Sequence, residues 1–270
     1  MGIFPVMRRL TLIVAGALAV TGCGASHHAA TATTTVTVTT TTSPATTTGT
    51  TTTAATALLR VYFLRDGKVA PVARTVAATR AVAAAAMRAL AAGPSDEERR
   101  LGFTSEVPSH DATPIVVTNG VATLPLPPNV TRPQLAQIVY TLTQFPTVHA
   151  VRSSRSLGDT PPMTRATFED LTPAILVESP LPDELVTSPL HIRGTANTFE
   201  AAFDLEMRNS SGVRIAWRFV TATSGSGERG TFDTTLSFPH TGGPLTLVAY
   251  EPSAENGKPL HVVRIPLEEG

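Results

Sequence analysis

The chain has 270 residues, with 21 basic residues balanced by 21 acidic residues and a single cysteine. At roughly 100–200 residues per domain, this length allows one large or two ordinary domains. A formal net charge of zero argues against a nucleic-acid-binding protein, which carries a basic surplus, and against a polybasic membrane-surface segment. One cysteine excludes an intrachain disulfide and any multi-cysteine zinc or iron–sulfur site.

The N-terminal 22 residues are typical of a bacterial secretory signal peptide. Two arginines precede an uncharged apolar run of eleven residues at 10–20, which is shorter than the about 20 residues that span a bilayer but fits a signal-peptide core. The VTGC tetrapeptide that follows ends on the lone cysteine and resembles a bacterial lipobox. That resemblance implies cleavage between Gly22 and Cys23 and acylation of the Cys23 thiol. Two or more acyl chains hold a protein stably on a membrane.

Residues 23–57 are predicted to form a disordered, threonine-rich tether. Threonine occupies 16 of the 23 positions from 31 to 53, and no charged residue occurs between Arg9 and Arg60. A tract without large apolar side chains has nothing to bury, so the entropy cost of ordering it is not offset. We therefore expect an extended stalk that carries a folded region away from the membrane.

Residues 58–155 are predicted to form a small α+β domain. The pattern gives a strand at 58–64, a helix at 79–92 that ends before Gly93-Pro94, strands at 115–118 and 121–126 around an Asn-Gly turn, a helix from a Thr131 capping box through Phe145, and a strand at 147–151. The order β-α-β-β-α-β indicates helices on one face of a sheet.

Three strings of this unit carry a family resemblance: VYF at 61–63, ALAAGP at 89–94 and QIVYTLTQFPTV at 137–148. Together they resemble the GerMN domain of sporulation and spore-germination proteins. Within the last string, Tyr140 and Gln144 are candidate contacts for a ligand or partner. The other interpretation, which the usual placement of these residue types favours, is that both serve packing and capping.

Residues 156–172, which are polar and contain Pro161-Pro162, are predicted to be a linker to a second domain at 173–270. There the apolar residues recur with period two in about seven short strands separated by Gly- and Asn-containing turns, as in an immunoglobulin-like sandwich. With no disulfide available, we expect an aromatic core around Trp217, Phe219 and Phe232.

Five strings of the second domain carry another family resemblance: VESP at 177–180, SPL at 188–190, GTANTFEA at 194–201, RGTF at 229–232 and EPSAENG at 251–257. Together they resemble Gmad2, an immunoglobulin-like domain of germination-related proteins. Phe199 and Glu200, an aromatic residue beside a carboxylate, are candidate contacts for a bound sugar or peptide. The other interpretation places Phe199 in the core and pairs Glu200 with an arginine such as Arg229.

We expect a lipid-anchored, extracytoplasmic, non-catalytic binding or scaffolding protein on the outer face of the cytoplasmic membrane. No G-x-S-x-G, H-E-x-x-H or P-loop pattern occurs in the sequence, and we expect no enzyme activity, cofactor, metal site or nucleic-acid partner. The anticipated partner is an envelope protein, which an exposed sheet edge could accept as an added strand, or a wall polymer. The resemblances imply a sporulation or spore-germination context, and the excess of arginine over lysine suits a GC-rich actinobacterial source.

A second hypothesis makes the chain a cell-wall (peptidoglycan) hydrolase or a direct accessory to one. Its carboxylates would come from residues such as Glu106, Asp111 and Glu200. Glycoside hydrolysis requires two carboxyl groups about 5–9.5 Å apart on either side of a cleft, and the sequence alone does not bring any two of these together.

Overall fold

The computed structural model describes residues 55–109, 114–155 and 160–270, all of which belong to one compact unit. The predicted signal peptide, Gly22, Cys23, the tether and Asp111 lie outside these residues. None of the helices within the described ranges has the length and hydropathy needed to cross a bilayer.

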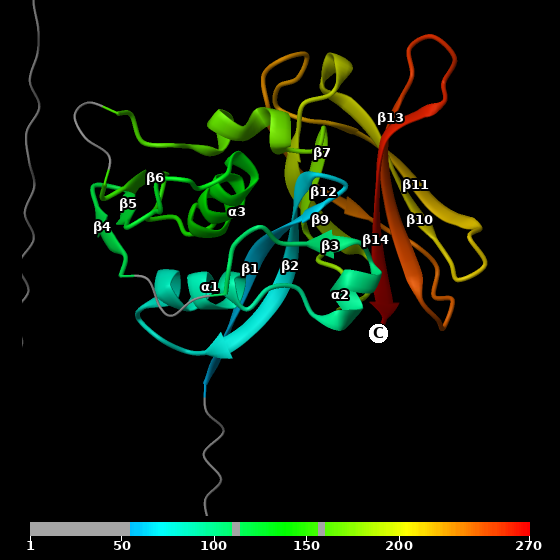
Figure 1. Cartoon of the computed structure of the whole chain (residues 1–270). Coiled ribbons are helices and arrows are strands. Elements are labelled where there is room, and N and C mark those ends of the chain that lie inside the picture. Colours follow the sequence, from blue (N-terminus) through cyan, green and yellow to red (C-terminus); the bar gives the residue numbers. More distant parts are fainter. Residues whose placement is uncertain (1–54, 110–113, 156–159) are drawn as a thin grey trace, which may run out of the picture. The chain divides into compact units, whose positions relative to one another are not determined.

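The N-terminal part of the unit begins with a long antiparallel hairpin. Strands β1 (Thr56–Arg65) and β2 (Lys68–Ala77) pair along their whole lengths, and the short β3 (Phe103–Thr104) adds to β1 to give the order β2-β1-β3 (Figure 1). The sequence analysis missed β2, because Pro71 lies within it and proline usually argues against a strand. The observed sheet order explains the exception, since β2 lies at the edge, where a missing N–H is tolerated.

Three helices follow the hairpin: α1 (Val82–Ala91), α2 (Asp96–Arg100) and α3 (Arg132–Leu142). The Thr131 side chain caps α3 in the predicted capping box, and Gly93 follows α1 with a φ of 77°. Helix α1 starts later than Thr79, after Ala81. Helix α3 ends at Leu142 and not at Phe145, because its last turn is followed by a non-helical Thr143.

A second sheet, of order β4-β5-β6, completes this part. Strands β4 (Val116–Thr118) and β5 (Val121–Leu124) form the predicted hairpin, and β6 (Ala150–Ser153) pairs with β5 in parallel. Asn119 and Gly120 both have positive φ, 49° and 78°, as a type I′ turn requires. The region is thus mixed α and β, but its strands form two sheets, and its element order includes β2, α2 and β3 in addition to the expected β-α-β-β-α-β.

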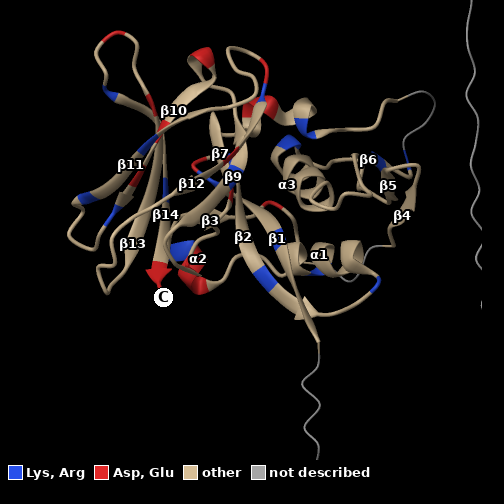
Figure 2. Cartoon of the chain, turned by 180° about the vertical axis from the view of Figure 1, so that it is seen from behind, with Lys and Arg blue, Asp and Glu red and all other residues tan. Residues whose placement is uncertain are grey.

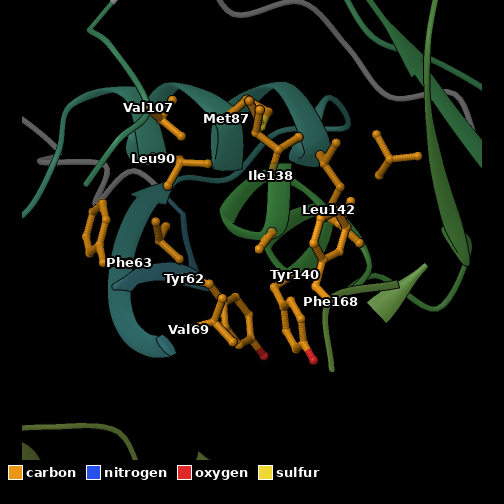
Figure 3. Close-up of a cluster of buried hydrophobic side chains, with 14 of the residues drawn as sticks. Tyr62, Phe63, Val69, Met87, Leu90, Val107, Ile138, Tyr140, Leu142 and Phe168 are labelled. Atoms are coloured by element: carbon orange, nitrogen blue, oxygen red, sulfur yellow. The ribbon is translucent and has the colours of Figure 1, made fainter. Parts of the chain in front are cut away.

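The hydrophobic core of this part lies between the helices and the β1–β2 hairpin. Leu90 of α1, Ile138 of α3 and Tyr62 of β1 all converge there (Figure 3). Phe168 also joins this core, with only 1% of its surface exposed. It belongs to the 3₁₀ helix η1 (Arg165–Leu171), within the segment that the sequence predicts as a linker.

The C-terminal part is a sandwich of two sheets. One sheet has the order β12-β9-β7, from β7 (Ile175–Ser179), β9 (Leu190–Ala196) and β12 (Gly230–Leu236). The other has the order β11-β10-β13-β14-β8 and comprises β8 (Glu184–Val186), β10 (Ala202–Arg208), β11 (Arg214–Thr221), β13 (Leu245–Pro252) and β14 (Pro259–Glu269). Short strand β8, parallel to β14, is an addition to the predicted strands.

The predicted aromatic core is wrong at two of its three positions. Trp217 and Phe219 are 51% and 54% exposed, because β11 is an edge strand and these residues point away from the facing sheet. Phe232 is buried as expected, and its ring meets that of Phe203 edge to face at 4.9 Å between centroids. Phe203 therefore takes the core position that the sequence analysis gave to the aromatics of β11.

Candidate functional site

The turn that joins β9 to β10 presents an aromatic side chain to solvent. It contains the 3₁₀ helix η2 (Phe199–Ala201) after Thr198, and residues 198–201 are called the presenting turn below. Phe199 is 58% exposed, so it does not belong to the core. Glu200 and Ala201 both have left-handed backbone conformations, with φ of 54° and 58°. Such conformations cost about 1–3 kcal/mol each in non-glycine residues and cluster at functional sites.

Buried and neighbouring groups hold this strained turn in place. The carboxylate of Glu251, a buried residue of β13, accepts a hydrogen bond from the Phe199 N–H at 3.0 Å, and the Ser226 hydroxyl accepts one from the Glu200 N–H at 3.0 Å. Gly225 packs directly against the turn, since a Cβ there would lie 2.5 Å from the Ala201 Cα. The turn is therefore fixed from three directions.

Asn197, just before the turn, connects it to the predicted linker. Its Oδ1 accepts a hydrogen bond from the Gly227 N–H at 2.9 Å, and its Nδ2 donates to Glu169 at 2.9 Å. Arg229 binds the same Glu169 carboxylate through Nε and Nη2, at 2.9 and 2.8 Å. Burial alone would raise the pKa of Glu169, but the hydrogen bonds from Arg229 and Asn197 outweigh it and hold that pKa below its usual range.

A cavity of about 560 Å³ adjoins this network. Its lining combines four basic residues, two acidic residues and an apolar floor that includes Val69 and Val263: Arg65, Lys68, Arg229, Arg264, Asp66 and Glu169. Arg65 donates a hydrogen bond to the Arg264 carbonyl oxygen at 3.0 Å, and this bond fixes one edge of the cavity. Because Glu169 is held as an anion by two donors, it is a structural counterion here and is poorly suited to act as a general acid.

The two candidate residues of α3 and its C-terminal end make their hydrogen bonds inside the protein. Tyr140 is fully buried, and its hydroxyl lies 2.5 Å from the Thr172 hydroxyl. Gln144 bridges to the backbone of β1, since it accepts from the Arg60 N–H at 2.8 Å and donates to the Arg60 carbonyl at 2.5 Å. Both side chains thus have partners inside the protein, in line with the packing and capping interpretation.

The two candidate residues of the presenting turn behave differently. Phe199 and Glu200 are both exposed, and the pairing of Glu200 with Arg229 is wrong, because Arg229 pairs with Glu169. The sequence analysis missed Glu169 and Glu251. Glu169 gave no signal, because it stands in a polar segment predicted as a linker, whereas Glu251 and Asn197 both belong to strings that carry the family resemblance.

The carboxylates of the hydrolase hypothesis are not gathered into one site within the described residues. Glu106 binds the Thr131 hydroxyl at the N-terminus of α3, and Glu200 lies on the presenting turn. Asp111 lies outside the described residues. In the part of the chain that the structure describes, no group of three or more His, Cys, Asp or Glu side chains is placed to hold a metal ion.

Two family models match separate regions of the chain. Residues 60–152 match a family described as sporulation and spore germination, and residues 174–258 match Gmad2, the immunoglobulin-like domain of bacterial spore germination. Each match covers less than half of the chain and falls on the region for which the sequence suggested the same family, so both resemblances are confirmed.

The other comparisons are sparse. No curated protein matches the chain. A solved structure of the tandem GerMN domains of the sporulation protein GerM from Bacillus subtilis is similar at 13% identity and a TM-score of 0.33. That match covers 68% of this chain and 62% of the GerM structure, so the chain spans less than two thirds of it.

Proposed function

We propose that this chain, which joins one domain from each of two germination-related families, is a non-catalytic binding module of the cell envelope. In this proposal a lipid on Cys23 anchors it to the outer face of the cytoplasmic membrane, and the threonine-rich segment holds the folded unit away from the bilayer. The signal-like N-terminus and the lipobox-like VTGC string support the anchor. The presenting turn is the contact point for an envelope protein.

The observation that carries this proposal is the combination of exposure and rigidity at Phe199. Its side chain is 58% exposed, yet its backbone N–H is bound by the buried Glu251 carboxylate. A backbone that is already fixed reduces the conformational entropy lost on binding, and aromatic side chains contribute strongly to the energetics of protein interfaces. A strained turn that only closed two strands would not require an exposed phenylalanine.

The contact is tested by crosslinking and affinity capture from detergent-solubilised envelope with the full-length protein. The Phe199→Ala variant is expected to lose a defined protein partner that the wild type captures. Val213→Ala is the matched control, because Val213 is also 58% exposed, and it should retain the partner. Equal capture by wild type and Phe199→Ala would contradict the proposed contact.

The anchor requires a separate test. Intact-mass analysis of the native protein should show a chain that begins at Cys23 and carries acyl groups. The Cys23→Ser variant should move from the membrane fraction to the soluble fraction after cell breakage. A wild-type protein of unmodified mass would contradict the anchor without affecting the partner experiment.

The hydrolase alternative has less support, because glycoside hydrolysis needs a protonated carboxyl group as general acid. Glu169, a partly exposed carboxylate that lines one cavity, is paired with Arg229, which favours its ionised form. We expect no release of soluble sugar fragments when purified cell walls are incubated with the protein. Catalytic release that is lost in Glu106→Gln or Glu200→Gln would reverse this conclusion.

A further inference from the structure

We infer that the outer face of the β11-β10-β13-β14-β8 sheet binds a glycan whose sugars carry carboxylate groups. The face is called the sheet platform and is defined by two exposed aromatic residues, a tyrosine, three arginines and two acids: Trp217, Phe219, Tyr250, Arg208, Arg214, Arg264, Asp204 and Glu206. This inference rests on the side chains of the platform and does not depend on the presenting turn.

The exposed aromatic side chains lie on one face of one strand. Trp217 and Phe219 are two positions apart on β11 and are 51% and 54% exposed. Alternate residues of a strand point to the same side. Large exposed apolar groups in a polar setting mark interaction sites. One face of a pyranose ring presents C–H groups, and these pack on the face of an aromatic ring.

The strand register places polar groups directly beside these rings. Trp217 lies opposite Glu206, and Phe219 lies opposite Asp204, which on its other side faces Tyr250. Residues that are directly opposite in neighbouring strands have side chains in contact on the same face. The aromatic rings and the polar groups therefore form one continuous surface, as a ligand with both apolar and hydroxyl-bearing faces requires.

A buried carboxylate fixes the donors of the platform. Glu206 is only 3% exposed and accepts hydrogen bonds from Arg208 Nε at 2.9 Å, from Arg214 Nη1 at 3.2 Å and from the Tyr250 hydroxyl at 3.0 Å. Burial alone would raise the pKa of Glu206, but these hydrogen bonds hold it below its usual range. The two guanidinium groups are thus oriented before any ligand arrives, which reduces the entropy cost of binding.

The charge balance of the platform favours an acidic ligand. Its three arginines exceed its two acids, Asp204 and Glu206. Both acids lie on β10, whereas the arginines come from three strands: Arg208 from β10, Arg214 from β11 and Arg264 from β14. Figure 2 shows both basic and acidic positions on the strands of this sheet. The Arg208 and Arg214 side chains are 42% and 56% exposed, so both keep N–H donors toward solvent. Guanidinium groups bind carboxylates with strong, directional hydrogen bonds.

Two further features complete the site. A cavity of about 560 Å³ opens on this face and is lined by Arg208, Tyr250 and Arg264, among others. The Oδ1 atom of Asp204 is buried and has no hydrogen-bond partner within the described residues, and an unpaired buried acceptor is costly. Sugar hydroxyls are donors of the kind that could satisfy it, whereas an aliphatic ligand has none.

The exposed aromatics are poorly explained by the addition of a partner strand to the β11 edge. Arg218 lies opposite Leu205, a fully buried residue of β10, so this edge carries a charge on its core-facing side. The pairing of β10 with β11 is also irregular between Met207 and Arg208. Inward-pointing charges and bulges are features that prevent strand addition at an edge. The ligand is therefore expected on the face of the sheet.

The chain contains one tryptophan, so the fluorescence of Trp217 reports directly on the platform. The probe is the peptide-free glycan chain of peptidoglycan, whose alternate sugars bear a free lactyl carboxylate. Chitohexaose is the matched neutral probe with the same backbone. We expect a saturable change in emission with the acidic chains and about tenfold weaker binding of chitohexaose, the effect of one charge-assisted hydrogen bond.

Three variants complete the test. Phe219→Ala and Arg208→Gln should each weaken binding of the acidic chains, and Leu185→Ala, at an exposed position on the far edge strand of the same sheet, should not. Phe219 is exposed, so its variant should keep the wild-type fold. Polyglutamate, an acidic polymer without sugars, is a further control. The inference would be overturned if Trp217 emission did not change, if chitohexaose or polyglutamate bound as tightly as the acidic glycan chains, or if Phe219→Ala kept the wild-type affinity for those chains. Phe199→Ala should bind the glycan normally, which separates this site from the proposed partner contact.

Discussion

Arg165 of η1 and Glu178 of β7 form a salt bridge of 2.9 Å that ties together the two halves of the folded unit. The guanidinium group of Arg165 also lies over the Tyr140 ring, 4.7 Å from its centroid, and over the Tyr62 ring at 5.4 Å. Tyr62 in turn donates its hydroxyl hydrogen to Glu178, 116 positions further along the chain. Figure 3 shows the two tyrosine rings next to each other in the core.

Removal of Glu178 should destabilise the protein strongly. The Glu178→Ala variant leaves Arg165 and the Tyr62 hydroxyl without their shared partner, so we expect the free energy of unfolding to fall by about 3 kcal/mol. Urea denaturation measures this change. Glu97→Ala is the control, because its pair with Arg100 is exposed and should contribute less than about 1 kcal/mol. Similar losses of unfolding free energy in both variants would show that the Arg165–Glu178 pair stabilises the protein no more than an exposed ion pair does.

The same carboxylate should make stability depend on acid pH. Burial would raise the pKa of Glu178, but Arg165 and Tyr62 hold it below its usual range. A lowered folded-state pKa gives stability that is present above the unfolded-state pKa of about 4.3 and is lost as the pH falls through the folded value. The difference in unfolding free energy between wild type and Glu178→Gln should therefore shrink between pH 6 and pH 3. A constant difference over that range would contradict this assignment.

All three tyrosines of the chain should resist ionisation in the folded protein. Burial raises the pKa of Tyr62 and of Tyr140, and burial together with Glu206 raises the pKa of Tyr250 to about 12. Because the raised pKa favours the protonated form, this stability is present below pH 10 and is lost as the pH rises toward the folded values. Ultraviolet titration should show no ionisation near pH 10 until the protein unfolds, and all three tyrosines should ionise there in urea. Ionisation of a tyrosine near pH 10 in the native protein would contradict the burial and pairing of these hydroxyls.

Two phenylalanines of neighbouring strands should differ sharply in their effect on stability. Phe203 of β10 is fully buried, so Phe203→Ala should cost about 3–5 kcal/mol. Phe219 of β11 is 54% exposed, and Phe219→Ala should stay within about 1 kcal/mol of wild type. Thermal or urea unfolding of both variants decides the matter. A larger loss of stability in Phe219→Ala than in Phe203→Ala would contradict the observed core and support the aromatic core expected from the sequence.

One glycine of the sandwich should not tolerate even a methyl group. A Cβ at Gly194 of β9 would lie 2.0 Å from the Leu176 carbonyl oxygen and 2.7 Å from the Phe232 ring. Gly194→Ala should therefore prevent β7, β9 and β12 from pairing and lower the melting temperature or the yield of folded protein. Gly243→Ala is the control, because a Cβ at Gly243 would lie 4.0 Å from its nearest neighbour, the Ser210 Oγ. This variant should have the same melting temperature as wild type.

The elements that the sequence predicted well depend on contacts within a few residues. The capping box of Thr131 and Gln134 and the turn at Asn119 and Gly120 are local, because the participating atoms lie within one turn of the backbone. The about seven strands of the second domain were predicted from the alternation of apolar residues with period two, which is also a local signal. Strand β2 was missed because Pro71 is acceptable only at a sheet edge, and edge position is a property of the assembled sheet.

By itself, the sequence determined the zero net charge, the isolation of Cys23 in an uncharged N-terminal block, the two regions of different periodicity and the family resemblance of each. Only the tertiary structure decided which face of β11 is buried, because period two separates the faces of a strand without saying which one meets another sheet. It also decided the partners of Arg229 and Tyr62, which lie 60 and 116 positions away. Such pairs form where packing brings distant segments together, and no local pattern records them.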